Sequence, residues 1–174
     1  MKQVIYKISS LFFSFFIVVL SFGQGIGSNK VTLDNNFNNK FDPAFNNLGN
    51  EFYFVSNTSG KFKLYFSKKN NLNKWSKALP VENINNFKNG LANIRYPSLN
   101  YDGSVLYFSA DYSKDSSDID IYYSVRKSGI WSLPISIGVP INSKGSEEQP
   151  SISADNKSLY FVRNNTTSEI ENFA

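Results

Sequence analysis

The chain has 174 residues, enough for one domain of ordinary size, and it combines 16 Phe and 10 Tyr with only 18% charged residues. This composition suits short strands with bulky cross-strand pairs and excludes a disordered chain. The formal net charge of +4 comes from scattered lysines. A nucleic-acid-binding surface needs a concentrated basic face, so we expect no nucleic-acid partner.

The chain contains no Cys and no His. Disulfides, thiolate nucleophiles, Cys-rich zinc sites and a histidine general base are therefore excluded. Serine, tyrosine and carboxylate chemistry remain open. The sequence predicts no cofactor.

Residues 1–23 have the pattern of a secretory signal peptide. A positive start, an apolar run and small residues at a cleavage site follow in order: Lys2 and Lys7, residues 11–20, and Ser21 with Gly23. An uncleaved membrane anchor is the alternative, but the run is shorter than the ~20 residues that a spanning helix needs. We expect export to the periplasm, outer membrane or exterior, cleavage near Gly23 and no membrane span afterwards. Cleavage leaves 16 basic and 14 acidic residues.

An Asn-rich leader, residues 24–40, comes next, and only residues 31–33 look like a strand. We expect it to lie over the fold or to supply one edge strand.

Repeats dominate the chain from residue 41. Pro43, Pro97 and Pro150 lie 54 and 53 residues apart, a fixed period that is typical of propellers and solenoids. The period predicts blades at about 41–92 and 93–146 and a partial one at 147–163. Residues 164–174 do not continue the pattern, and we expect a disordered tail there.

Each full repeat predicts a similar series of strands. In the first repeat they cover residues 51–56 and 61–67, with a third short strand between Trp75-Ser76 and Val81. The second repeat offers residues 104–109, a strand carrying Ile119, Ile121 and Tyr123, and a strand after Trp131-Ser132, while the third offers only residues 157–163. Matching dipeptides close the full repeats: Ile84-Asn85 and Ile141-Asn142.

Strands such as residues 105–108 are apolar on both faces, so both faces should be covered. Propeller blades meet this condition because each packs between neighbours. The fold class is therefore all-β, a partial β-propeller of antiparallel blades with two full repeats plus a truncated third. Because closed propellers need about four to eight blades, we expect no closed ring from this chain alone. An unpaired blade edge would favour self-association.

The second repeat carries the most specific motifs: Pro97-Ser98-Leu99, Asp102-Gly103, Leu106-Tyr107-Phe108-Ser109, Asp120-Ile121-Tyr122-Tyr123-Ser124 and Trp131-Ser132. This pattern resembles the WD40-like β-propeller repeat of TolB-type propellers and of OmpA-associated envelope proteins of Bacteroidetes. The likeness covers roughly residues 41–163 and is weaker in the first repeat, where Leu48 stands at the turn Asp position. It implies a secreted or periplasmic binding or scaffold module.

Asp102 and Asp155 occupy matching turns. They could form a carboxylate ring for a cation, or bond their own backbone as turn residues, which we favour. Asp118 and Asp120 could bind calcium through oxygen ligands, but a solvated strand edge is the simpler interpretation because Lys63 stands at the position of Asp120 in the first repeat.

Glu147 and Glu148 could form the carboxylate pair of a hydrolase. Neighbours on an extended strand point to opposite faces, which argues against it. We therefore predict no catalytic, cofactor-binding or metal-binding residue.

Trp75 and Trp131 share a repeat position, and so do three tyrosines: Tyr53, Tyr107 and Tyr160. Recurrence in each repeat favours packing between blades over a single binding site. A binding surface could still use loops at one end of the propeller, including residues 70–74 and 114–118.

The sequence favours an exported, non-enzymatic binding or scaffold module of a bacterial cell envelope. Its partner would be a protein or another envelope component, and the chain would be part of, or truncated from, a larger OmpA-associated or TolB-like protein. The alternative is the propeller portion of a secreted glycan hydrolase or peptidase, although no Gly-x-Ser-x-Gly motif is present. A fragment without a function of its own is a third interpretation.

Overall fold

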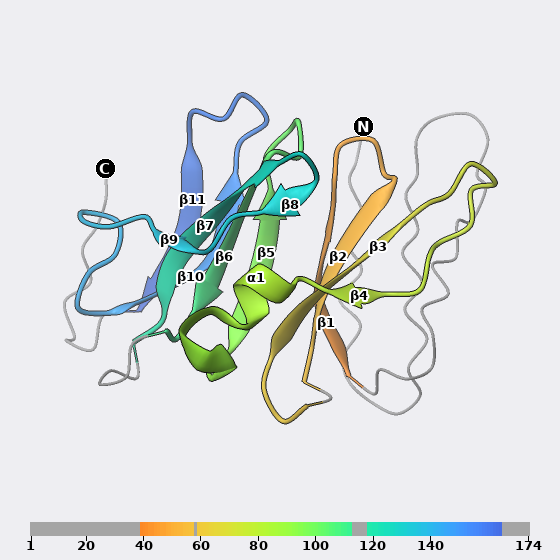
Figure 1. The fold of residues 1–174 in the computed structure, drawn as a ribbon. Helices are drawn as coiled ribbons and strands as arrows, with labels where there is room; N and C mark the ends of the chain where they lie inside the picture. Colours follow the sequence, from red (N-terminus) through yellow and green to blue (C-terminus); the bar gives the residue numbers. More distant parts are fainter. Residues whose placement is uncertain (1–38, 58, 113–117, 165–174) are drawn as a thin grey trace, which may run out of the picture. The chain divides into compact units, whose positions relative to one another are not determined.

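The structure, a computed structural model, describes residues 39–57, 59–112 and 118–164. The predicted signal peptide, residues 24–38 of the leader and residues 165–174 of the tail lie outside the described residues. The described part is almost entirely β-structure, in three antiparallel sheets that follow one another along the chain (Figure 1). No helix in this part is long and apolar enough to cross a membrane.

We name the three sheets blades 1, 2 and 3. Blade 1 contains β1 (Lys40–Phe45), β2 (Glu51–Ser56), β3 (Lys63–Lys68) and β4 (Leu79–Pro80) in that order. Blade 2 contains β5 (Ile94–Leu99), β6 (Val105–Ala110) and β7 (Asp120–Lys127), with β8 (Ile130–Trp131) and β9 (Ile135–Ser136) both paired to β7. Blade 3 contains β10 (Ser146–Ile152) and β11 (Leu159–Asn164).

The blades repeat one another in register. Tyr53 on β2 lies opposite Phe66 on β3, and the matching Tyr107 on β6 lies opposite Tyr123 on β7. Blade 1 continues into blade 2 through backbone bonds, since the amide of Ile94 donates to the carbonyl of Phe62 at 2.9 Å. The fold is a partial β-propeller with two full blades and a truncated third, as the repeats predict.

The first strand of every blade was missed, because within each predicted repeat the first strand was expected only at what is the second strand of the blade. These strands, β1, β5 and β10, contain Pro43, Pro97 and Pro150, and proline ordinarily argues against a strand interior. Each strand has a register shift at its proline, and the preceding residue has a positive φ: 52° at Asp42, 54° at Tyr96 and 56° at Gln149. A β-bulge at this point lets a proline stand inside a paired strand.

The Ile-Asn dipeptides close each blade through a side-chain amide. Asn85 accepts from the amide of Leu64 at 2.9 Å and donates to the carbonyl of the same residue at 2.8 Å. Asn142 makes the same two bonds, both 3.0 Å, with Ile121. Each buried asparagine thus replaces a strand partner near the start of β3 or β7.

The serine of each Trp-Ser dipeptide accepts a hydrogen bond from a serine on the third strand of its blade. Ser67 on β3 donates to the carbonyl of Ser76 at 2.7 Å, and Ser124 on β7 donates to that of Ser132 at 2.7 Å. The recurring serines therefore hold strands together.

A short helix, α1 (Glu82–Asn85), and a 3-10 turn, η1 (Phe87–Gly90), connect blade 1 to blade 2. The sequence analysis did not predict them. Their carbonyls face Lys63, whose Nζ donates to Asn85, Gly90 and Ala92 at 3.2, 2.6 and 3.0 Å. Burial lowers the pKa of this lysine, and the nearby charge of Lys61 lowers it further, while Asp111 opposes them.

One hydrophobic core runs through blades 1 and 2. Tyr53, Val55 and Leu64 from blade 1 pack with Ile94 and Leu106 from blade 2, and all five are fully buried. The opposite face of β2 is also covered, because Phe52 and Phe54 are 3% and 1% exposed. Burial on both faces is the arrangement expected of a strand between neighbouring blades.

Candidate functional site: the cleft between blades 1 and 2

A cleft of about 200 Å³ lies where blade 1 meets the outer strands of blade 2. Its walls combine aromatic rings, aliphatic residues, two cations and one carboxylate: Tyr53, Phe66, Trp131, Val81, Ile130, Lys68, Arg126 and Glu82. The hairpin between β7 and β8 supplies Ile130, which is 67% exposed.

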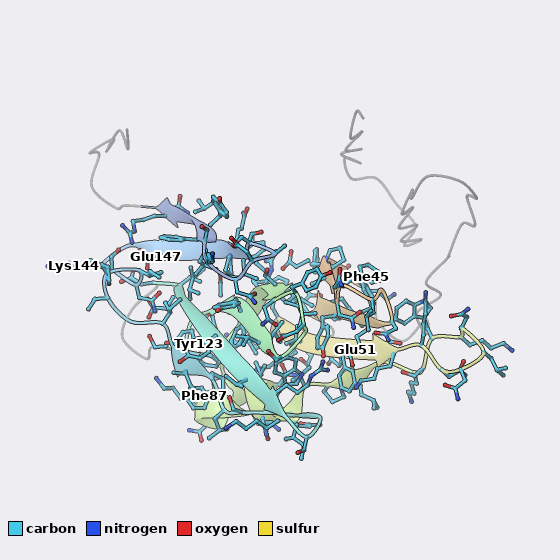
Figure 2. The ribbon with its side chains drawn as sticks, turned by 90° about the horizontal axis from the view of Figure 1, so that it is seen from above. Phe45, Glu51, Phe87, Tyr123, Lys144 and Glu147 are labelled. Carbon is cyan, nitrogen blue, oxygen red and sulfur yellow. The ribbon has the colours of Figure 1, made fainter. Side chains whose placement is uncertain are left out.

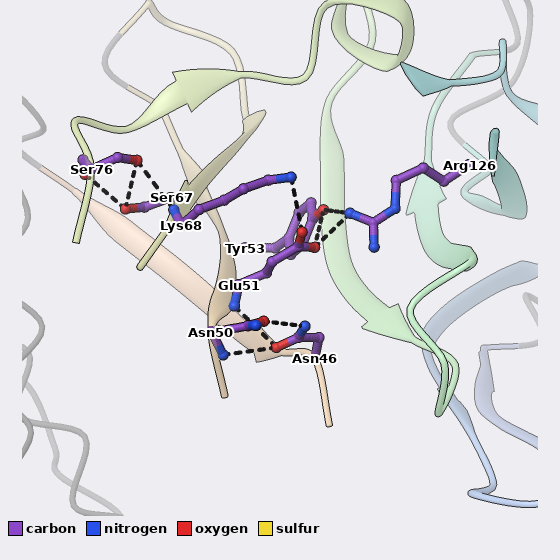
Figure 3. Close-up of polar contacts among 8 residues, drawn as sticks. All are labelled: Asn46, Asn50, Glu51, Tyr53, Ser67, Lys68, Ser76 and Arg126. Atoms are coloured by element: carbon purple, nitrogen blue, oxygen red, sulfur yellow. Dashed lines mark hydrogen bonds and ion pairs between the residues drawn. The ribbon is translucent and has the colours of Figure 1, made fainter. Parts of the chain in front are cut away.

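Glu51 is the centre of the polar contacts beside this cleft (Figure 3). Its Oε2 accepts from Arg126 Nη1 at 2.6 Å, and its Oε1 pairs with Lys68 Nζ at 2.9 Å. Tyr53 also donates its hydroxyl to Glu51 at 3.2 Å. One carboxylate therefore joins a cation of its own blade to a cation of the next blade.

Burial and charge act on Glu51 in opposite directions. Burial raises its pKa, but the hydrogen bonds and positive charges of Lys68 and Arg126 together outweigh that effect, so the pKa lies below its usual value. Burial and the charge of Glu51 raise the pKa of Tyr53. Glu51 is thus held as a carboxylate that binds the two cations. Tyr53 is held as a neutral phenol that donates its hydrogen bond to Glu51.

The backbone around Glu51 is fixed by the preceding turn. Asn46 accepts from the amides of Asn50 and Glu51, both at 3.0 Å, and donates to the side chain of Asn50 at 2.6 Å. The turn therefore presents the carboxylate at the start of β2 in a fixed position.

Arg126 is held from several sides. Its guanidinium lies 5.0 Å from the ring centre of Trp131, and its amide donates to the carbonyl of Ser104 at 2.7 Å. Gly103 has a φ of 70°, and a Cβ there would lie 3.2 Å from Arg126 Nη2. Glycine at this turn therefore serves both the backbone conformation and the close approach of the arginine.

The charged side chains at the cleft differ in exposure. Lys68 has a side chain that is 45% exposed, whereas those of Arg126 and Glu51 are 17% and 12% exposed. Glu51 and the exposed Glu82 of the lining balance the two cations, so the cleft offers charged groups of both signs beside aromatic rings.

Sequence reasoning missed Glu51, Lys68 and Arg126. The available signal was departure from the repeat: Val105 and Ser158 stand at the positions that match Glu51 in the other blades. A charged residue that replaces an apolar or small one in only one repeat marks a contact specific to that blade.

The predicted turn aspartates have the contacts of turn residues. Asp102 accepts from the amide of Ser104 at 2.9 Å, and Asp155 accepts from that of Lys157 at 3.1 Å. Hydrogen bonds from neighbouring serines, Ser104 and Ser153, together with these amides, lower the pKa of each aspartate. The two carboxylates lie in separate blades and are bound within their own turns.

Asp118 and Asp120 differ from the solvated strand edge that the sequence analysis favoured, because both are partly buried. Burial raises the pKa of Asp120, and the charges of Glu147 and Asp118 raise it further. Within the described ranges, no group of three or more acidic residues could hold a metal ion.

Glu147 and Glu148 differ in burial and share no hydrogen-bond or ion-pair partner within the described residues. Glu147 is fully buried, where it accepts from Arg163 Nε at 2.9 Å and from the hydroxyl of Ser143, while Glu148 is partly exposed. Figure 2 labels Glu147 and Glu51, which belong to different blades and do not meet.

The recurring aromatic residues have different environments. Trp131 is 6% exposed and meets Tyr53 edge to face across the blades, with ring centres 6.1 Å apart. Trp75 packs on Phe45 and Phe52 of its own blade. Tyr160 is 66% exposed, so the prediction that it packs between blades is wrong for the described residues.

The two loops proposed for binding are only partly described. Asn70 closes the loop of residues 70–74 by accepting from the amides of Leu72 and Lys74 at 2.9 and 3.0 Å. Most of the other loop, residues 114–117, lies outside the described residues.

No protein-family model matches the chain, and no curated protein matches it. Among solved structures, the crystal structure of TolB from Acinetobacter baumannii is similar at 15% identity, with a TM-score of 0.35. The match covers 75% of this chain and 39% of the TolB chain.

Proposed function

We propose that the chain is an exported, non-enzymatic β-propeller module that binds a protein or another component of a bacterial cell envelope. The observation that carries the proposal is the cleft between blades 1 and 2, where a half-exposed lysine and an arginine lie beside aromatic rings. This arrangement offers charge and apolar surface to a ligand. Export is supported by the pattern of residues 1–23.

The contacts of the acidic residues support binding over catalysis. Glu51 is bound by two cations, Glu147 by Arg163 and Ser143, and the turn aspartates by their own backbone. A general acid–base pair needs carboxyl groups that share one reacting position. These carboxylates are instead used to hold the fold.

Mass spectrometry of the mature N-terminus, combined with cell fractionation, tests export. We expect a chain that begins near Gln24 in the periplasmic, outer-membrane or extracellular fraction. Intact Met1 on cytoplasmic protein would contradict the proposal.

A panel of glycoside, ester and peptide substrates tests the absence of catalysis. We expect no turnover by the full mature chain, with Glu147→Gln/Glu148→Gln as the comparison variant. Turnover that this double change abolishes would support the hydrolase alternative instead.

A further inference from the structure

Four turns lie next to one another at one end of blades 1 and 2, because the strands that they connect are antiparallel (Figure 1). The amide of Lys69 donates to the carbonyl of Asn50 at 2.9 Å, and the amide of Arg126 donates to that of Ser104 at 2.7 Å. The ion pair between Arg126 and Glu51 joins the two blades at this end. We name this surface the turn face, and it consists of residues 46–51, 68–75, 100–104 and 126–130.

The turn face lies entirely within the described residues. The described chain begins and stops at the opposite end of the blades, since Lys40 pairs with Ser56 and Asn164 pairs with Ser146. The two interruptions of the described chain follow β2 and β6, whose last residues also lie at that opposite end. The groups that the turn face presents are therefore not a consequence of where the described chain begins or stops.

Each turn of the turn face presents one large apolar side chain that is between 56% and 76% exposed: Leu48, Leu72, Tyr101 and Ile130. Of these four, only Ile130 lines the cleft between the blades. The other three are single side chains on separate turns. This surface therefore offers several isolated apolar contacts beside the cleft.

Cations outnumber carboxylates on the turn face: Lys68, Lys69, Lys74, Arg126 and Lys127 stand against Glu51 and Asp102. Glu51 is bound by two of these cations, and Asp102 accepts from the amide of Ser104. Lys74 and Lys127 are exposed, and neither forms an ion pair within the described residues. Positive charge thus remains for an anionic partner.

We propose that the turn face docks on a lipid bilayer with anionic headgroups, as a peripheral contact. Aliphatic and tyrosine side chains enter the boundary between headgroups and acyl chains, while lysines stay among the phosphates. A bilayer accepts separate side chains from four turns, whereas a folded protein partner needs a surface of complementary shape. The inference rests on the proposed function and names a lipid surface as the envelope component.

Binding to vesicles tests the proposal. The full mature chain should co-sediment saturably with vesicles of equimolar phosphatidylglycerol and phosphatidylcholine. Binding should be at least about tenfold weaker with phosphatidylcholine alone, and it should weaken as salt is added, because lysines supply part of the attraction. No binding to the anionic vesicles, or equal binding to both kinds, would overturn the proposal.

Apolar variants locate the contact. Leu48→Ser/Leu72→Ser should weaken binding to the anionic vesicles about tenfold or more, because two inserted side chains are lost. Leu91→Ser/Val139→Ser changes side chains that are 67% and 87% exposed at the opposite end of the blades, and it should leave binding unchanged. Equal effects of the two variants would contradict docking through the turn face.

Charge variants test the lysines separately. Lys74→Gln/Lys127→Gln should weaken binding about tenfold or more, since each lysine near an anionic surface contributes about fivefold. Lys61→Gln/Lys144→Gln removes the same charge from exposed residues at the opposite end and should have little effect. A larger effect of the second pair would place the bilayer at the other end and refute the proposal.

The absence of cysteine from the chain allows a direct test of insertion. An environment-sensitive dye on Leu72→Cys should shift its emission to shorter wavelength when anionic vesicles are added. The same dye on Leu91→Cys, at the opposite end, should not respond. A response at position 91 alone, or at neither position, would contradict the proposed orientation.

The same assays separate this proposal from its alternatives. Binding of polyglutamate without binding of vesicles would assign the turn face to an acidic protein and overturn the bilayer proposal. The assays use purified protein, so their result does not depend on export. Failure of vesicle binding would leave the envelope role standing, whereas a cytoplasmic location would refute that role whatever the vesicles show.

Discussion

Glu51 joins blade 1 to blade 2 through Arg126 at 2.6 Å, and it also binds Lys68 at 2.9 Å. We predict that Glu51→Gln lowers the free energy of unfolding by about 1–3 kcal/mol, because the partly buried Arg126 and the half-exposed Lys68 lose their counter-charge. Urea unfolding measures the change. Glu82→Gln, at an exposed carboxylate, should have almost no effect.

The same pair predicts a pH dependence. Because the pKa of Glu51 is lowered in the folded state, the ionised side chain contributes to the free energy of unfolding. This contribution is complete above the unfolded-state pKa of about 4.3. The contribution is lost as the pH falls through the lower folded-state pKa. The stability difference between the wild type and Glu51→Gln should therefore be largest above about pH 5 and shrink under more acidic conditions. A difference that grows on acidification would contradict the ion pair.

For Asp120 we predict the opposite effect on the free energy of unfolding at neutral pH. Burial and the charges of Glu147 and Asp118 raise its pKa, so the ionised form destabilises the folded state. We expect Asp120→Asn to increase the free energy of unfolding at pH 7 by about 0.2–1 kcal/mol, the scale of charge interactions near a surface. The gain should disappear at pH 3, where the wild-type carboxyl is protonated. A loss of stability at neutral pH would show that Asp120 has a favourable partner.

In each full blade, a buried asparagine makes two hydrogen bonds to the backbone of one residue on the third strand. We predict that Asn142→Ala lowers the free energy of unfolding by about 2–4 kcal/mol, because the buried amide and carbonyl of Ile121 both lose a partner. Asn142→Asp should also destabilise, since a carboxylate oxygen would face that carbonyl. Asn86→Ala, at an exposed asparagine, is the control for denaturant unfolding. Equal effects at Asn86 and Asn142 would contradict a stabilising role for the two hydrogen bonds between Asn142 and Ile121.

The strands that the sequence predicts well are those with apolar residues on both faces, such as β2 and β6. The first strands were missed because local rules exclude a proline from a strand interior, and only a β-bulge with a left-handed residue before the proline removes that conflict. The cleft was missed for a different reason. Glu51 and Arg126 lie 75 positions apart, and no local pattern pairs them.

At the scale of the molecule, the described part contains two full blades and two strands of a third. Repeat arrays bury their core only through neighbours and caps, so the exposed face of β11 predicts low stability or association with other chains.

Light scattering and thermal melting of residues 24–174 test the partial-propeller account most directly. We predict association that increases with protein concentration, or a low melting temperature. A monodisperse monomer that melts cooperatively at high temperature would contradict the account.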